Sequence, residues 1–302
     1  MSTSLLDAPQ DQAASTHRSR ALLDIDPQEF GRCFGKRPFL IGHHLCDHPL
    51  FDLRRLLDLA RSLPERHIEY NAGTLPVNQD QSLTPRNGLS AEETIRRIQD
   101  CQSWLVLKWV EHDPEYRALL EACLDEVRPH SERLAPGMRQ PQAFIFVTSP
   151  RSVTPYHIDP EHNFLLQIRG SKLVRQFDGL DSTILSHEEL ERFYGARVRN
   201  MTLKDENRDR CWTFDLQPGQ GLHFPVTFPH WVQNGDEVSV SFSITFRTPD
   251  LDRRRMVYQF NHGLRQWGPI PTPYGQNSAL DQMKYQLVRA WSKVRSQFGR
   301  DD

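Results

Sequence analysis

The 302-residue sequence has few cysteines, little net charge and no long apolar segment. Its five cysteines are scattered without a CxxC pair, which argues against a zinc site and a disulfide framework and indicates reduced thiols. The formal net charge is −2, so no electrostatic feature supports binding of nucleic acid or an acidic membrane surface. Apolar runs such as "SWLVLKWV" are far shorter than the ~20 residues that cross a bilayer. We therefore expect a cytoplasmic protein without nucleic-acid or membrane partners.

The N-terminal half of the sequence predicts a tail followed by a mixed α/β scaffold. Residues 1–20 are polar and lack the layout of a secretory signal, so we expect them to form a disordered tail. Between residues 21 and 140, apolar residues at intervals of three and four predict helices over 52–63 and 114–127. Ser90 and Glu93 have the spacing of a capping box. We expect this region to pack on a core formed by the rest of the chain.

Residues 141–250 have a β character and form the expected core. The segment 163–177 reads as two strands joined by a tight turn at Gly170, and 237–247 alternates apolar and polar residues without a break. Short strands separated by Gly/Pro turns predict a mainly β protein with flanking helices. The expected core is a double-stranded β-helix, that is, a cupin-like jelly roll.

The last region, 251–302, predicts an extension that ends in an amphipathic helix. Its apolar residues recur at intervals of three and four: Leu280, Met283, Leu287, Trp291, Val294 and Phe298. Two interpretations are open. The helix covers a face or edge of the β-core, or it pairs with a second copy in a homodimer.

A candidate metal site begins with His157 and Asp159. Residues two apart on an extended segment point to the same side, so both can face one cavity. The missing third ligand is His230 or His223; we favour His230, which follows a Pro-rich loop, whereas His223 lies between apolar residues of a strand. Two histidines and one carboxylate with open positions are typical of non-haem Fe(II) oxygenases.

Two longer blocks, "VTPYHIDPEHNFLLQIRGSK" and "LQPGQGLHFPVTFPHWVQN", extend this pattern within residues 142–248. They resemble the JmjC-type, or cupin-like, Fe(II)- and 2-oxoglutarate-dependent oxygenases. Their motif layout is most similar to that of the asparaginyl hydroxylase that inhibits the hypoxia-inducible factor. The matching residues are Thr154, Pro155, His157, Asp159, Asn163, Phe164, Gly170 and Lys172 in the first block and Pro218, Gly219, Pro225, His230 and Asn234 in the second.

The resemblance implies a role for each of these positions. Fe(II) would be bound by His157, Asp159 and His230, and O₂ would be the oxidant. The distal carboxylate of 2-oxoglutarate would be anchored by Lys172 and Thr154, a charge-assisted pair with a neighbouring hydroxyl. The remaining assignments are weaker: Asn163 and Ser243 would line the co-substrate pocket, His223 and Asn234 would support the site or, for Asn234, form a turn, and no separate acid or base is expected.

The implied reaction hydroxylates a protein or peptide side chain, or a small amino-acid-like substrate, and releases succinate and CO₂. Two other readings stay open. One is a metal cupin dioxygenase that does not use 2-oxoglutarate, although such proteins usually add histidines and lack the anchoring Lys172. The other is a non-catalytic cupin-like domain that binds or senses a ligand. The sequence does not distinguish hydroxylation from demethylation.

Overall fold

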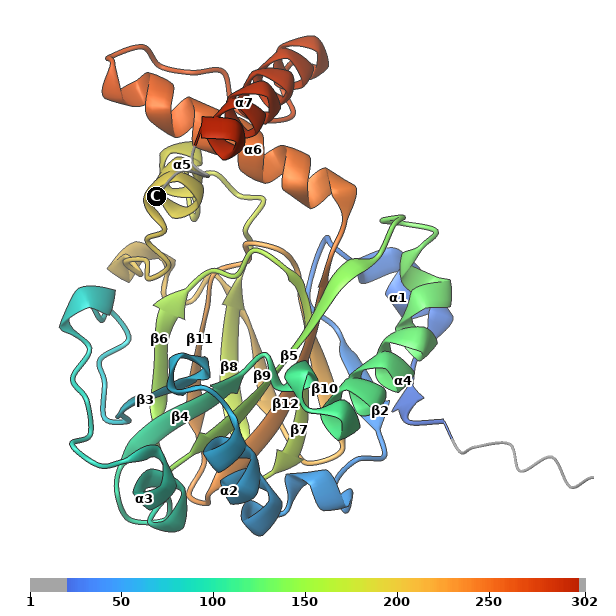
Figure 1. Ribbon diagram of the computed structural model, residues 1–302, viewed down its shortest axis with the longest axis vertical. Helices are drawn as coiled ribbons and strands as arrows, with labels where there is room; N and C mark the ends of the chain where they lie inside the picture. Colours follow the sequence, from blue (N-terminus) through green and yellow to red (C-terminus); the bar gives the residue numbers. More distant parts are fainter. Residues whose placement is uncertain (1–20, 299–302) are drawn as a thin grey trace, which may run out of the picture.

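A computed structural model describes residues 21–298, with side chains described as far as residue 293 (Figure 1). The tail expected over residues 1–20 lies outside the described residues. The helices are α1 (Pro27–Cys33), α2 (Leu53–Ser62), α3 (Ala91–Arg96), α4 (Pro114–Ser131), α5 (His187–Ala196), α6 (Pro249–Gln266) and α7 (Ser278–Phe298). The strands are β1 (Leu23–Asp24), β2 (Leu40–His43), β3 (Ile68–Ala72), β4 (Ser103–Lys108), β5 (Arg139–Thr148), β6 (Val153–His157), β7 (His162–Arg169), β8 (Lys172–Phe177), β9 (Cys211–Leu216), β10 (Gln220–Phe224), β11 (His230–Asn234) and β12 (Ser239–Arg247).

Two antiparallel sheets form the core. The larger has the order β1-β2-β10-β7-β12-β5-β4-β3, and the smaller has the order β6-β11-β8-β9. From β5 to β12 the chain passes repeatedly from one sheet to the other, so strands that are distant in sequence become neighbours. This winding is the jelly-roll arrangement, and the expectation of a mainly β fold with flanking helices is confirmed.

The N-terminal region joins the larger sheet at both of its edges. Strands β1 and β2 continue the sheet beyond β10, and β4 and β3 continue it beyond β5. The region from 21 to 140 therefore shares a hydrogen-bonded sheet with the core in addition to packing on it. The boundaries at residues 140 and 250 stay a prediction.

Helices α1, α2 and α4 cover the outer face of the larger sheet (Figure 1). The predicted apolar stripe of α4 is buried in this layer, and the predicted helix over 52–63 is present as α2. The Ser90 hydroxyl accepts a hydrogen bond from the Glu93 N–H at 3.1 Å, as expected for an N-cap. The apolar residues of β12, Phe242 among them, pack against this helical layer.

The polar face of β12 is buried as well, between the two sheets. The Ser241 hydroxyl donates to Gln167 at 2.7 Å, and the Ser243 hydroxyl donates to Asn163 at 2.8 Å. These bonds link β12 to β7 on the inner face of the larger sheet. The alternation of β12 thus separates the helix-covered core from the polar interior of the roll.

The C-terminal helices lie together at one end of the roll, where α6 contacts both α5 and α7 (Figure 1). The stripe predicted for α7 is exposed where side chains are described: Met283 and Leu287 are each 49% exposed, and Trp291 is 71% exposed. Val294 and Phe298 lie outside the described side chains. Among the described residues, no helix has the length and apolar character needed to cross a bilayer.

Candidate metal centre and adjoining pocket

A β-bulge brings the motif residues onto one face of the smaller sheet. On β11, His230 pairs with His157 and Val232 pairs with Thr154, so three residues of β6 span the distance of two residues of β11. The extra residue of the bulge lets both Thr154 and His157 face the interior, although their odd spacing would place them on opposite faces of a regular strand. The Thr-Pro-x-His spacing is therefore a property of the bulge.

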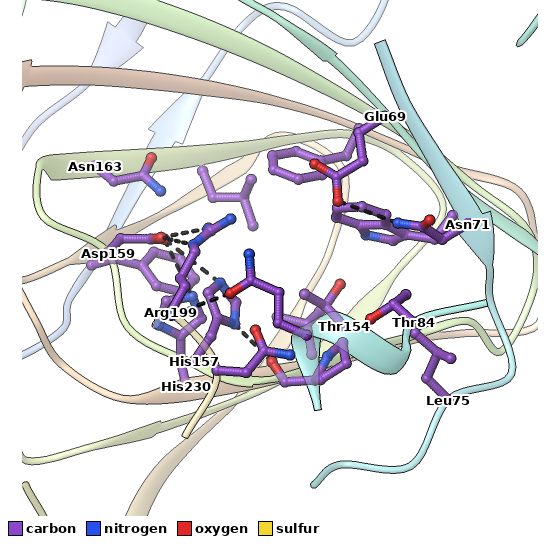
Figure 2. A pocket seen from close by; sticks show the side chains of 18 of the residues that line it. Glu69, Asn71, Leu75, Thr84, Thr154, His157, Asp159, Asn163, Arg199 and His230 are labelled. Carbon is purple, nitrogen blue, oxygen red and sulfur yellow. Dashed lines mark hydrogen bonds and ion pairs between the residues drawn. The ribbon is translucent and has the colours of Figure 1, made fainter. Parts of the chain in front are cut away.

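The ligand atoms of His157, Asp159 and His230 converge at this face (Figure 2). The Asp159 Oδ2 atom lies 3.7 Å from His157 Nε2 and 3.6 Å from His230 Nε2. Two atoms that are each ~2.1 Å from one ion are separated by at most ~4.2 Å, so these separations suit a single metal. Among the described residues, this is the one group of three metal-ligating side chains found.

Backbone carbonyls fix the tautomer of both histidines. The Nδ1 atom of His157 lies 2.7 Å from the Pro155 carbonyl oxygen, and that of His230 lies 3.0 Å from the Phe228 carbonyl oxygen. Each Nδ1–H donates to its carbonyl, which leaves a lone pair on Nε2 for a metal. Burial lowers the pKa of His157 well below its ordinary value and also lowers the pKa of His230, so both rings are neutral, as ligands must be.

Arg199, which the sequence analysis did not identify, holds the carboxylate of Asp159 in place. Its Nε donates to Asp159 Oδ1 at 3.0 Å, and Nη2 donates to the same oxygen. Burial alone would raise the pKa of Asp159, but the positive charge of Arg199 and its hydrogen bond outweigh burial and hold that pKa below its ordinary range. Because Arg199 occupies Oδ1, the other oxygen stays directed at the histidines.

Replacing Arg199 with methionine should weaken Fe(II) binding by about 10- to 100-fold, the range seen when a hydrogen-bond partner of a metal ligand is lost. The carboxylate would be free to rotate away from the two Nε2 atoms. Competition with a chromophoric chelator measures the affinity. The matched control is Arg197→Met, at an exposed position two residues earlier; equal affinities in the two variants would contradict the assigned role.

Lys172 is a buried ammonium without an anionic partner in the described part of the chain. It is 4% exposed, and burial lowers its pKa to about 7. Its Nζ atom lies 5.7 Å from the centre of the Phe146 ring. On β11, its pairing partner Asn234 lies four residues, or about 13 Å at ~3.3 Å per residue, beyond His230. The ammonium is thus set well back from the metal ligands, with Thr154 between them.

Asn163 and Ser243 contribute to the opposite wall. Asn163 lines the pocket from β7, and its Oδ1 accepts the hydrogen bond from Ser243 on β12. Ser243 is 2% exposed and is not part of the pocket lining. Ser243 therefore orients the Asn163 amide from behind, and the Asn163 NH₂ group is left for the pocket.

His223 and Asn234 lie outside the pocket lining. His223 pairs with Phe164 on β7 and stacks 4.9 Å from Phe34, on the helix-covered face. Its Nδ1 lies 3.0 Å from the Asn163 carbonyl oxygen, so its link to the site passes through the backbone. Asn234 ends β11 and donates to Thr148 Oγ1 at 2.6 Å, which ties β11 to the end of β5.

The pocket has a volume of about 290 Å³, and its lining includes Asn163 of the larger sheet and Thr154 of the smaller sheet (Figure 2). One wall is formed by the strap, residues 75–84, whose Leu75, Gln81 and Thr84 line the pocket. Asn78 fastens the strap to the segment that follows Arg199: its Oδ1 accepts from the Leu203 N–H at 2.7 Å, and its Nδ2 donates to the Leu203 carbonyl at 3.0 Å. The position of Arg199 is thus coupled to the strap.

Comparisons with known proteins find one similar sequence and several similar solved structures. No protein-family model matches the chain. JmjC domain-containing protein D of Dictyostelium discoideum is 33% identical over 100 residues, or 31% of this chain and 22% of that protein. The match thus spans about a fifth of the relative's length.

Among solved structures, E. coli ycfD aligns with a TM-score of 0.51 and 16% identity, over 91% of this chain and 69% of that one. Another structure of YcfD, described as a ribosomal oxygenase, has a TM-score of 0.49, 15% identity and coverages of 91% and 68%. A YcfD complex with cobalt and 2-oxoglutarate has a TM-score of 0.49, 15% identity and coverages of 90% and 66%. The first of these likenesses shows that the chain shares the fold of this bacterial protein.

Proposed function

We propose that the protein is an Fe(II)- and 2-oxoglutarate-dependent oxygenase. One observation carries the proposal: three convergent metal-ligating atoms share a pocket with a buried ammonium that has no anionic partner among residues 21–293. The donor set of two imidazoles and one carboxylate suits Fe(II) with open coordination positions. A buried cation without a partner is unfavourable, so the Lys172 ammonium favours an anionic co-substrate over a cupin dioxygenase that does not use one.

Each residue of the site would have a distinct task. His157, Asp159 and His230 would hold Fe(II), which would supply oxidation of a substrate C–H bond by O₂, coupled to conversion of 2-oxoglutarate to succinate and CO₂. The Lys172 ammonium would pair with the distal carboxylate of 2-oxoglutarate, and the Thr154 hydroxyl would donate to it. The apolar side chains of Leu165 and Phe224, which line the same pocket, would exclude water.

For the substrate, we propose a chemical class and no specific molecule. A protein or peptide side chain, or a small amino-acid-like molecule, would be hydroxylated. The likeness to the asparaginyl hydroxylase rests on the motif residues alone and stays a prediction, as does a cytoplasmic location.

The direct test is co-substrate turnover. Purified protein supplied with Fe(II), O₂ and 2-oxoglutarate should form succinate, and His157→Ala should form none because one of the three ligands is missing. Absence of succinate from the wild-type protein across a range of Fe(II) concentrations would reject the proposal.

We further propose that α7 mediates a homodimer, since its stripe of Met283, Leu287 and Trp291 is exposed on the isolated chain. Trp291→Asp would place a charge in the centre of such an interface and should shift the protein towards monomer in sedimentation velocity. Gln286→Asp, at an exposed position beside the stripe, is the control. Identical sedimentation of both variants and the wild type would contradict a dimer formed through α7.

A further inference from the structure

A second groove adjoins the metal pocket along the edge of the larger sheet. Strand β3 is the last strand of that sheet, and within the described residues no strand flanks its outer side. A groove of about 410 Å³ runs along this side and is lined by Glu65, Arg66, Ile68, Glu69, Tyr70, Asn71 and Arg86. Glu69 and Asn71 also line the metal pocket (Figure 2), so the groove and the pocket share a wall.

Backbone hydrogen bonds show which groups of β3 face the groove. The Gly73 N–H donates to the Gln102 carbonyl at 2.6 Å, towards the chain that leads into β4, whereas the Ala72 N–H donates outward to the Pro85 carbonyl at 2.9 Å. Successive residues of a strand direct their N–H groups to opposite sides, so the Tyr70 N–H points outward like that of Ala72. The Ile68 N–H, which also points outward, donates to the Glu65 carbonyl. Of the outward N–H groups of β3, that of Tyr70 is the one to which the described part of the chain gives no acceptor.

We propose that a short extended polypeptide segment pairs with Tyr70 at the edge of β3, between the bonded positions Ile68 and Ala72, and delivers one of its side chains past Glu69 and Asn71 into the metal pocket. Addition of a strand to an exposed sheet edge is a common mode of peptide recognition. Side chains directly opposite each other on paired strands share a face of the sheet. Guest residues opposite Glu69 or Asn71 therefore face the metal pocket.

The shared wall indicates the chemistry of the guest. Glu69 forms an ion pair with Lys108, and both line the metal pocket, so their charges offset each other. On β4, Trp104 pairs with Asn71 and lines the same pocket, and its buried Nε1–H has no acceptor among the described residues. The offset charges suit an uncharged guest side chain, whereas the indole Nε1–H is closed to solvent and does not face the guest.

The groove itself indicates a polypeptide rather than a small molecule. A groove of about 410 Å³ beside the sheet edge has side chains that a free amino acid bound in the metal pocket would not contact. The groove carries acidic and basic side chains, Glu65, Arg66 and Arg86 among them, which suits a polar chain segment. Proline is excluded at the guest position that must donate to the Tyr70 carbonyl. This inference rests on the proposed oxygenase function and names the substrate class of that site.

The experiment uses a proline-free library of random blocked decapeptides as the probe, with the Fe(II)-loaded wild-type protein and 2-oxoglutarate. Two matched probes are the same library N-methylated on its backbone amides and a mixture of free amino acids of equal composition. Succinate release, oxygen incorporation into the probe and hydrogen exchange at the Tyr70 amide are measured. The unmethylated library should stimulate succinate release, gain oxygen and slow exchange at Tyr70, and the other two probes should do none of these.

Protein variants test the same hydrogen bond from the other side. Tyr70→Pro removes the outward N–H at an edge position, where proline is tolerated. It should lower library-stimulated succinate release by about tenfold, equivalent to the ~1.4 kcal/mol of one backbone hydrogen bond. Tyr70→Phe keeps the N–H and should retain the stimulation. The methylated and unmethylated libraries are compared on the wild-type protein. That comparison tests the same hydrogen bond even if Tyr70→Pro fails to fold.

Stimulation by free amino acids to the same extent, or by the methylated library, would overturn the added-strand proposal. Failure of the proposed function looks different, because no succinate would then form with or without any probe. Hydrogen exchange at the Tyr70 amide does not depend on turnover. If no succinate forms, slower exchange in the presence of the unmethylated library still supports binding of the peptide at this edge. Unprotected Tyr70 exchange with every probe overturns it.

Discussion

Replacing Lys172 with methionine should weaken 2-oxoglutarate binding by about 30- to 4,000-fold and leave Fe(II) binding unchanged. The range corresponds to the ~2–5 kcal/mol lost when one partner of a buried, hydrogen-bonded charge pair is removed. Methionine keeps an unbranched apolar stem, so packing beside Phe146 is retained. Anaerobic calorimetric titration of Fe(II) into the metal-free protein measures the Fe(II) affinity, and titration of 2-oxoglutarate into the Fe(II)-loaded protein measures the co-substrate affinity. A 2-oxoglutarate affinity equal to that of the wild type would remove Lys172 from the site.

The same substitution should stabilise the protein when 2-oxoglutarate is absent, because it removes a buried charge to which the described residues provide no anionic partner. Burial lowers the pKa of Lys172 to about 7 in the folded protein, below its value of ~10.4 in the unfolded chain. Between these values the unfolded state binds more protons, so the wild type gains stability as pH rises from about 7 towards 10. The Lys172→Met variant should lack that contribution.

Urea unfolding of the 2-oxoglutarate-free protein at pH 7 and pH 9.5 measures this difference. The control is Lys36→Met, which replaces an exposed lysine and should behave like the wild type. A Lys172→Met variant less stable than the wild type at pH 7 would indicate that the ammonium has a stabilising partner in the unliganded protein.

Replacing Asp159 with asparagine should reduce Fe(II) affinity by more than about 100-fold and abolish succinate formation. Loss of an outer hydrogen-bond partner alone reduces metal affinity by about 10- to 100-fold, and loss of a charged ligand exceeds this. Asparagine matches the shape of aspartate but provides no anionic oxygen opposite His157 and His230, and it leaves Arg199 without its counter-ion. Chelator competition measures the affinity.

Asp215→Asn is the matched control for this variant. Asp215 is an exposed aspartate on β9, in the smaller sheet that also contains His157 and His230. It should bind Fe(II) like the wild type. Retention of tight Fe(II) binding by Asp159→Asn would mean that the three convergent residues are not the metal centre.

Local patterns predicted several of the strands and helices and the candidate ligands. The alternation of β12 and the three- and four-residue spacing of α2 and α4 are short-range properties, which residue spacing reports directly. His230 was favoured over His223 because it follows a Pro-rich loop, and the structure shows which way His223 faces. On β10, His223 alternates with Phe224, which lines the pocket, so the ring of His223 faces the helix-covered side.

These local patterns did not predict which strands pair when the strands are distant in sequence. Strands β3 and β4 extend the larger sheet through β5, and β1 and β2 extend it through β10, although nothing in their sequences specifies the partner. The bulge between His157 and Thr154 depends likewise on the register of β11. The inner position of the β12 polar face follows from the second sheet, which single-strand alternation does not reveal.

Arg199 was missed for a related reason. It lies 40 residues after Asp159, in a segment outside the helices and strands that has no periodicity to direct attention to it. Its position is set by the pairing of its neighbours: the Met201 N–H donates to the Tyr156 carbonyl at 2.9 Å, and Asn78 fastens Leu203 to the strap. The one available signal was a charged residue beside Asn200, which is too common a pattern to single out.

The central claim is that one pocket holds Fe(II) through His157, Asp159 and His230 and 2-oxoglutarate through Lys172. Anaerobic titration of Fe(II) and 2-oxoglutarate into the protein, followed by visible absorption, tests it most directly. The wild type should develop the Fe(II)–2-oxoglutarate charge-transfer band, His157→Ala should show none, and Lys172→Ala should show a weakened band that requires more 2-oxoglutarate. A wild-type protein that gives no band, or variants that give the full band, would contradict the claim.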